Sequence, residues 1–243
     1  MRNKLIVAVE EICVEKYTGA EIIFLAGSLV RGEGTASSDL DLVVMFRSLP
    51  RAYRESFRFR QWPVEAFVHD PETLKYFFLE RDKPSGVPSL ATMVSEGIEV
   101  PGANEFSRSV KQLAESVLSD GPPPWNQDDI DRSRYMITSL ADDLKEPRSA
   151  AESAASGAAL FEVLAMHYFR SRGLWSAKNK MIPRKLSETD PDFSERFVSS
   201  FADLFQTGNA QKVIKIAEDV LAPDEGWLFE GYTSFAPREW RSA

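Results

Sequence analysis

The sequence lacks residues and motifs that several classes of protein require. Cys13 is the single cysteine in 243 residues, which excludes an internal disulfide framework and favours the cytoplasm. No apolar run approaches the roughly 18 residues of a membrane span, so we expect no membrane partner. The chain also has no Gly-x-x-x-x-Gly-Lys-Ser/Thr loop, no zinc-type Cys/His spacing and no Gly-x-Ser-x-Gly elbow. These absences exclude P-loop, structural-zinc and serine-hydrolase chemistry of the usual kinds.

Positive charge and histidine are also scarce. Lysine and arginine number 29 against 37 aspartates and glutamates, which gives a net charge of −8 and a pI near 5.0. A DNA-binding protein is expected to present a basic face, so the sequence favours a partner other than DNA. Of the two histidines, His167 lies in an apolar helical segment and is expected in the core. His69 is expected near a helix cap or half-buried, rather than at a substrate.

The most informative stretch present is Leu25–Phe46. An apolar strand is expected at Glu21–Ala26, a Gly-Ser pair ends it, and a second strand is expected at Asp39–Phe46. Successive strand side chains alternate between faces, so Asp39 and Asp41 share one face about 6–7 Å apart. Carboxylates at this spacing suit one or two hard cations such as Mg²⁺. The residues alone also allow a plain turn at Gly27-Ser28 and a solvated loop edge at Asp39 and Asp41.

A further carboxylate occurs in the next expected strand, Trp62–Asp70. Alternation places valine and alanine side chains on one face and Glu65 with His69 on the other. A glutamate among apolar residues is costly to bury without a partner. Glu65 is therefore either part of a site or an edge-strand residue in water. Asp70 followed by Pro71 is typical of a helix start and is expected to be structural.

The order Gly-Ser, a gap, and Asp-x-Asp opening a strand resembles the signature of the nucleotidyltransferase superfamily that includes DNA polymerase β. The resemblance covers residues 21–70 and is strongest to small bacterial antibiotic nucleotidyltransferases and minimal nucleotidyltransferases with a helical C-terminal domain. It implies two Mg²⁺ ions held by Asp39, Asp41 and Glu65, the three expected catalytic residues. This chain has Glu65 where many relatives have aspartate, which leaves open whether Glu65 is a metal ligand, a base or both. The resemblance also implies that ATP or another nucleoside triphosphate is held through Gly27, Ser28 and Ser38.

The domain organisation is indicated by a break in the middle of the chain. Three consecutive prolines, Pro122–Pro124, stop any helix and extend the backbone. We predict an α+β fold in which residues 1–120 form a nucleotidyltransferase catalytic domain, a mixed sheet with flanking helices. Residues 121–243 are expected to form an all-α bundle that binds substrate or nucleotide, because their apolar spacing is helical throughout.

One basic segment of the predicted bundle is a further candidate. Acidic residues are absent from Val163 to Ser187, which holds six lysines and arginines. We expect residues 173–186 to be a loop after a long helix, with Lys178 and Lys180 contacting triphosphate. A solvated basic loop is the alternative. In the resembling enzymes the helical domain does supply basic residues to the phosphates.

The predicted function is therefore transfer of a nucleoside monophosphate, first of all AMP from ATP, to a hydroxyl of a small molecule. The resemblance suggests aminoglycoside-like or lincosamide-like antibiotics as acceptors. One alternative is a protein or RNA acceptor. Another is a nucleotide-binding regulator without catalysis, which intact carboxylates at Asp39, Asp41 and Glu65 disfavour.

Overall fold

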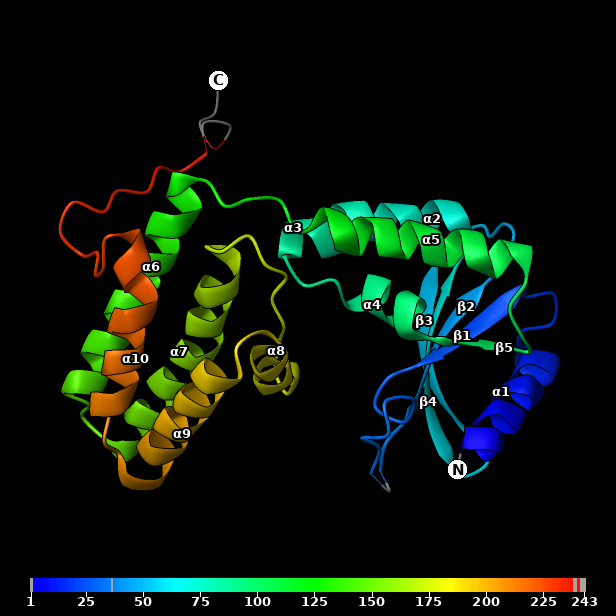
Figure 1. Ribbon diagram of the computed structural model, residues 1–243, viewed down its shortest axis with the longest axis horizontal. Helices are drawn as coiled ribbons and strands as arrows, with labels where there is room; N and C mark the ends of the chain where they lie inside the picture. The colour runs from blue at the N-terminus through cyan, green and yellow to red at the C-terminus, as the bar shows by residue number, and fades with distance from the viewer. Residues whose placement is uncertain (1, 36, 238–239, 241–243) are drawn as a thin grey trace. The chain divides into compact units, whose positions relative to one another are not determined.

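The computed structural model describes residues 2–35, 37–237 and 240. The chain divides between Gly121 and Pro122 into two compact units. The first unit is a mixed sheet with flanking helices and the second is helical (Figure 1), so the predicted fold class is confirmed. Among the described residues, no helix is long and apolar enough to cross a membrane.

In the described part of the first unit, the sheet has five strands in the order β3-β4-β2-β1-β5. Strands β2 and β4 pair in parallel, and the other neighbours pair antiparallel. This mixture makes β2 a central strand whose start lies beside the start of β4. The bounds are β1 Ile22–Ala26, β2 Leu40–Met45, β3 Tyr53–Phe59, β4 Trp62–His69 and β5 Ile98–Val100.

One face of the sheet packs against helix α1 (Arg2–Lys16), as Figure 1 shows. Alternation along β2 and β4 gives this face an unbroken apolar surface, because every second side chain is leucine, valine or alanine. The helix adds apolar side chains at a spacing of three or four residues, which line one side of a helix. Together they form a buried core that includes Leu5, Val9, Ile12, Leu40, Leu42, Val44, Val64, Ala66 and Val68. The opposite face carries Asp41 and Glu65.

Helices after β4 cover much of that opposite face. They are α2 (Pro71–Phe77), a π-helical turn (Phe78–Asp82), α3 (Lys83–Ser85), α4 (Ser89–Glu96) and α5 (Glu105–Asp120). Asp70 caps α2 as predicted, since its carboxylate accepts the backbone N–H of Thr73 at 2.9 Å. The buried Asp82 carboxylate accepts the N–H groups of Leu90 and Ala91 at 3.1 and 3.0 Å. It thereby fixes the start of α4 against the π-helical turn.

Leu29–Gly32 lie in the connection from β1 to β2. These residues form a non-helical turn after β1, held by bonds from the N–H of Arg31 to Gly27 O (3.4 Å) and of Glu33 to Ser28 O (2.9 Å). Gly32, at φ +77°, has a left-handed backbone that does not continue a right-handed helix. The turn therefore does not extend into a helix.

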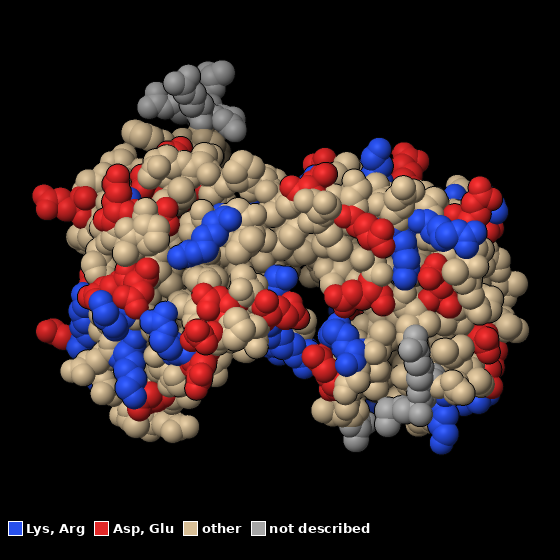
Figure 2. Space-filling view, viewed as in Figure 1, with Lys and Arg blue, Asp and Glu red and all other residues tan. Residues whose placement is uncertain are grey.

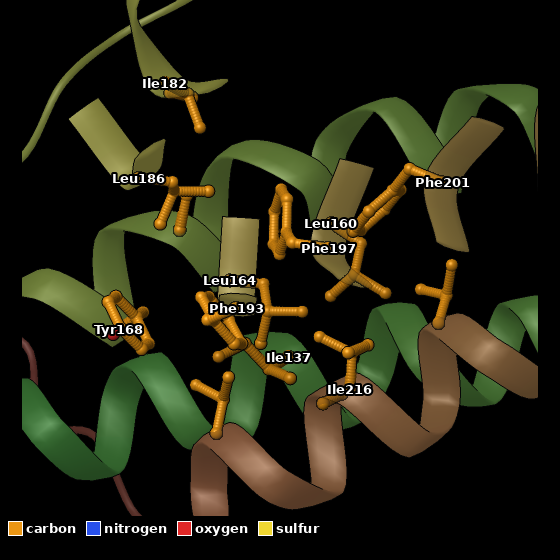
Figure 3. Packing of buried hydrophobic residues seen from close by; sticks show 14 of the residues in the cluster. Ile137, Leu160, Leu164, Tyr168, Ile182, Leu186, Phe193, Phe197, Phe201 and Ile216 are labelled. Atoms are coloured by element: carbon orange, nitrogen blue, oxygen red, sulfur yellow. The ribbon is translucent and has the colours of Figure 1, made fainter. Parts of the chain in front are cut away.

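The described residues of the second unit form five longer helices and a short 3₁₀ turn. They are α6 Gln127–Lys145, α7 Ala150–Arg170, α8 Met181–Thr189, α9 Pro191–Thr207, α10 Gln211–Leu221 and the turn Ala222–Asp224. Their apolar faces meet in one aromatic-rich core (Figure 3). Within it the Phe161 ring of α7 lies 4.9 Å from Phe197 and 5.0 Å from Phe201 of α9, between ring centroids. A side chain at Gly157 would collide with Leu204, at 2.8 Å, so glycine allows α7 and α9 to approach.

The prediction of a continuous loop over residues 173–186 is wrong. The segment is irregular to Lys180, but Met181 begins helix α8. Pro183 is compatible with this helix because it falls in the first turn, where backbone N–H groups have no helical partner. Ile182 and Leu186 then insert into the core, one turn apart.

Candidate active site

The strand register brings two of the predicted carboxylates together. In the parallel β2–β4 pair, Asp41 lies directly opposite Glu65, and neighbouring strands are about 4.8 Å apart. Asp39 lies directly before β2, two residues ahead of Asp41. All three residues are partly exposed, so they are within reach of solvent and ligand.

Gly27 packs against the side chain of Asp41. It follows β1 with φ +80°, and a Cβ built there would lie 1.9 Å from Asp41 Oδ2 and 2.8 Å from Cγ. The carboxylate of Asp41 therefore occupies the space that any side chain at position 27 would need. This explains the glycine physically, both by its left-handed backbone and by the close approach.

Ser28 and Ser38, predicted to contact nucleotide, lie together although ten residues separate them. The Ser28 hydroxyl donates to Ser38 Oγ at 3.3 Å, and Ser38 Oγ also accepts the backbone N–H of Thr35 at 2.8 Å. These bonds close the segment between β1 and β2 and hold both hydroxyls beside the start of β2. Hydroxyls on such a closed segment can donate to an anionic oxygen.

Glu65 has a partner that the sequence analysis did not foresee. The Arg54 guanidinium of β3 donates to Glu65 Oε1. Arg54 also lies over the ring of Phe67, with its Cζ 5.0 Å from the ring centroid. The Arg54 side chain is 61% exposed and that of Glu65 is 23% exposed, so the ion pair lies at the solvent edge of the sheet face.

The donor set fits a divalent cation by its backbone placement and its chemistry. Carboxylate oxygens from adjacent strand positions are the ligands that Mg²⁺ prefers. As the side chains lie, however, no three His, Cys, Asp or Glu residues of the described chain are grouped as a shared metal would require. Asp41 is turned over Gly27 and Glu65 is held by Arg54. Joint ligation by Asp39, Asp41 and Glu65 stays a prediction, in which the metal would compete with Arg54 for Glu65.

Lys178 and Lys180 lie in the second unit, in the irregular segment between α7 and α8, and both are exposed. Lys180 directly precedes α8 as its N-cap residue. On the face drawn in Figure 2, basic and acidic side chains are interspersed over both units. Contact of these two lysines with phosphate stays a prediction.

Neither histidine belongs to the carboxylate site. His69 is 5% exposed, and its ring meets that of Phe77 edge-on with centroids 5.7 Å apart. Burial lowers the pKa of His69, partly offset by the nearby Asp70 carboxylate. His167 is fully buried and hydrogen-bonds to Ser133 and Asp224, both at 3.0 Å. The expectation of a core histidine is confirmed for His167.

Arg54 is a residue of the candidate site that the sequence analysis did not identify, because its position depends on cross-strand pairing. The missing information was the hairpin turn at Arg60-Gln61, which sets Arg54 opposite Phe67 and thus diagonal to Glu65. Arg60 adopts φ 52° there, a conformation for which Asn-Gly or Asp-Gly is the usual sequence signal. Recognising that turn would have placed Arg54 on the carboxylate face.

Residues 6–86 match the family model of the nucleotidyltransferase domain. This chain carries a nucleotidyltransferase domain at its N-terminus. The match spans about one third of the chain and includes Gly27, Ser28, Asp39, Asp41 and Glu65. Helix α5 and the whole helical unit lie outside it.

Among solved structures, the chain is similar to a nucleotidyltransferase-like protein from Exiguobacterium sibiricum 255-15. The two share 15% identity with a TM-score of 0.43, over 90% of this chain and 75% of that chain. A likeness of this size does not establish a shared function. None of the curated proteins compared with the chain matches it.

Proposed function

We propose that this protein is a Mg²⁺-dependent nucleotidyltransferase that moves a nucleoside monophosphate, first of all AMP from ATP, to a hydroxyl of a small molecule. The observation that carries the proposal is the pairing of Asp41 with Glu65 on adjacent strands, within the nucleotidyltransferase domain. Gly27 supports the proposal, because the absence of a side chain at position 27 leaves room for the Asp41 carboxylate.

The proposed reaction requires little reactive chemistry from the protein. An acceptor hydroxyl oxygen attacks the α-phosphorus in line, the new P–O bond forms, the bond to the bridging oxygen breaks, and pyrophosphate leaves. Bound divalent cations would neutralise phosphate charge at this step, and Asp39 and Asp41 would hold them. Catalysis of this kind is mainly positioning and electrostatic stabilisation.

Two further roles follow from the placement of Glu65 and the serines. A Glu65 carboxylate released from Arg54 would lie beside Asp41, where it serves as a third ligand or accepts the proton of the acceptor hydroxyl. Ser28 and Ser38 would donate hydroxyl hydrogens to phosphate oxygens, with their mutual hydrogen bond keeping them beside β2. Aminoglycoside-like and lincosamide-like compounds are the first acceptors to test.

The test is transfer of label from α-labelled nucleoside triphosphates to a panel of acceptors, with Asp39→Asn and Asp41→Asn compared with the wild type. Each variant should lose on the order of a thousandfold in turnover, since one metal-binding carboxylate is removed. Without metal both should fold, with equal or slightly higher stability, because two like charges on one face repel. Glu80→Gln, an exposed carboxylate in the π-helical turn, should retain full turnover.

Two results would contradict the proposal. One is transfer at the wild-type rate by Asp41→Asn. The other is loss of activity that merely accompanies unfolding, as judged by circular dichroism. Labelling of protein or RNA instead of any small molecule would keep the chemistry and replace the acceptor class.

A further inference from the structure

The Arg54–Glu65 ion pair joins β3 and β4 across one face of the sheet, and the register of the two strands brings its side chains within reach. In the β3–β4 register Ser56 lies opposite Glu65 and Arg54 lies opposite Phe67. Arg54 therefore reaches Glu65 along the diagonal, a distance that long side chains span in antiparallel pairs. Its guanidinium rests over the Phe67 ring, an arrangement in which arginine is attracted to an aromatic face.

Strand β3 does not depend on this ion pair for its attachment. On the other sheet face, the Glu55 carboxylate accepts the Tyr17 hydroxyl at 2.8 Å and pairs with Lys16 Nζ at 3.0 Å. Arg60 pairs with Glu11 at 2.8 Å. These contacts join β3 and the hairpin turn to α1, so the loss of Arg54 leaves the strand held by its register and by α1.

We propose that Arg54 is an internal competitor for the metal ion, occupying Glu65 until a divalent cation displaces it. A carboxylate bound to guanidinium has given part of its acceptor capacity to Arg54. A metal ligated by Asp39 and Asp41 then gains Glu65 as a third ligand in competition with Arg54, which holds Oε1. This inference rests on the proposed function, since it concerns the same metal site.

The expected size follows from the exposure of the pair. An ion pair with an arginine side chain 61% exposed is weak, because water and salt screen it. Because the metal must compete with this ion pair, the wild type should bind the metal more weakly, by a factor of about 2 to 5, than a chain without the pair. The direction in which metal affinity changes on removing Arg54 distinguishes two roles. If Arg54 competes with the metal, its removal strengthens metal binding; if Arg54 instead oriented Glu65 toward the metal, its removal would weaken metal binding.

The experiment measures Mn²⁺ binding to the full chain by titration, with free Mn²⁺ followed by electron paramagnetic resonance. Arg54→Gln should bind Mn²⁺ about two- to fivefold more tightly than the wild type. Arg58→Gln is the matched control, because Arg58 lies on the same strand face opposite Pro63 and should leave binding unchanged. Glu65→Gln should abolish the difference that Arg54→Gln makes. If Arg54→Gln folds poorly, Arg54→Met keeps an apolar stem over Phe67 and should show the same gain.

Unchanged or weaker Mn²⁺ binding by Arg54→Gln, in a chain whose binding is lost on Asp41→Asn, would overturn the competitor role alone. A persistent Arg54→Gln effect in the Glu65→Gln background would overturn it as well. Absence of saturable Mn²⁺ binding by the wild type, or binding that survives both Asp39→Asn and Asp41→Asn, would overturn the proposed function and this inference together.

Discussion

At the scale of single residues, Gly27 and Asp41 act as one structural feature. The glycine provides a left-handed backbone at φ +80° and leaves the volume that Asp41 Oδ2 occupies. Either property alone would favour glycine, but the second also determines where the carboxylate points. Gly32 has nearly the same backbone, φ +77°, with no atom within 4 Å of a built Cβ. Gly32 is therefore a matched control for the collision that a side chain at position 27 would make with Asp41.

We predict that Gly27→Ala and Gly32→Ala share a backbone penalty of about 1–2 kcal/mol. Gly27→Ala should add to this by displacing Asp41, with a further loss of stability and at least about tenfold weaker Mn²⁺ binding. Urea unfolding and Mn²⁺ titration measure the two effects separately. Equal Mn²⁺ affinity in both variants would show that Asp41 tolerates a methyl group at position 27.

The sequence predicts those residues of the candidate site whose positions follow from local patterns, namely short motifs and the alternation of side chains along a strand. Gly-Ser after one strand and Asp-x-Asp before the next predicted the segment that the Ser28–Ser38 bond closes. Alternation placed Glu65 on the face opposite the valines, and the register places it beside Asp41. Arg54 was not predictable in the same way, because its position depends on cross-strand pairing through an unusual hairpin turn.

At the scale of secondary-structure elements, the cap of α2 joins two parts of the first unit. Asp70 is buried, and its carboxylate accepts the N–H of Thr73 in the helix and the N–H of Leu49 in the β2–β3 connection, both at 2.9 Å. Asn126 caps α6 with the same motif, accepting the N–H of Asp129 at 2.9 Å, but at an exposed position. The two caps differ mainly in burial and in the second acceptor role of Asp70.

Asp70→Ala should therefore cost about 2–3 kcal/mol of unfolding free energy, the sum of a lost cap and a partly buried donor, Leu49 N–H, left without its carboxylate partner. Asn126→Ala should cost about 1 kcal/mol. Chemical denaturation of both variants gives the comparison. Equal losses would mean that water satisfies the Leu49 N–H and that the connection to β2–β3 adds nothing.

Elements were predictable where a local signal marks their end, as at Asp70-Pro71, where the structure begins α2 with the predicted cap. Tertiary packing determined the remaining cases. Helix α8 begins within a polar, basic segment because Ile182 and Leu186 find room in the core of the helical unit. The helix after Asp70 passes into a π-helical turn at Phe78–Asp82, for which the periodicity gave no signal.

At the scale of the whole molecule, each unit buries one histidine, and the two histidines have different charged surroundings. In the helical unit, His167 links α6 to the segment that follows α10. A carboxylate only accepts hydrogen bonds, so Nε2 carries the proton toward Asp224 and Nδ1 accepts the hydroxyl of Ser133. Arg134 holds the same segment by donating to Gly226 O at 2.9 Å. Burial lowers the pKa of His167, and the Asp224 carboxylate partly opposes this.

The first unit buries Asp82 as a second titrating group, in addition to His69. Burial raises the pKa of Asp82 to about 6, against the effect of the N–H groups of Ala91 and Leu90. Its native form therefore binds more protons than the unfolded chain between pH of about 3.8 and 6, and its contribution to stability rises as pH falls through that window. His69 has the opposite effect, because a lowered pKa means that the unfolded chain binds more protons below about pH 6.5. The two groups therefore act on stability in opposite directions in the first unit.

Among the described residues of the helical unit, no other group with a shifted pKa opposes the effect of His167 between pH of about 5.5 and 7.5 in the way that Asp82 opposes His69. Its folded pKa lies below the unfolded value of about 6.5, so its stabilising effect is complete above that pH and is lost as pH falls toward the folded pKa. We predict that the helical unit loses more stability than the first unit between pH 7.5 and 5.5. Hydrogen exchange, corrected for the intrinsic effect of pH, should show protection falling first in α6, α7 and the segment after α10. His167→Gln, which cannot titrate, should start from lower stability but flatten this dependence. An unchanged slope in that variant, or an equal loss in both units of the wild type, would assign the pH dependence to other groups.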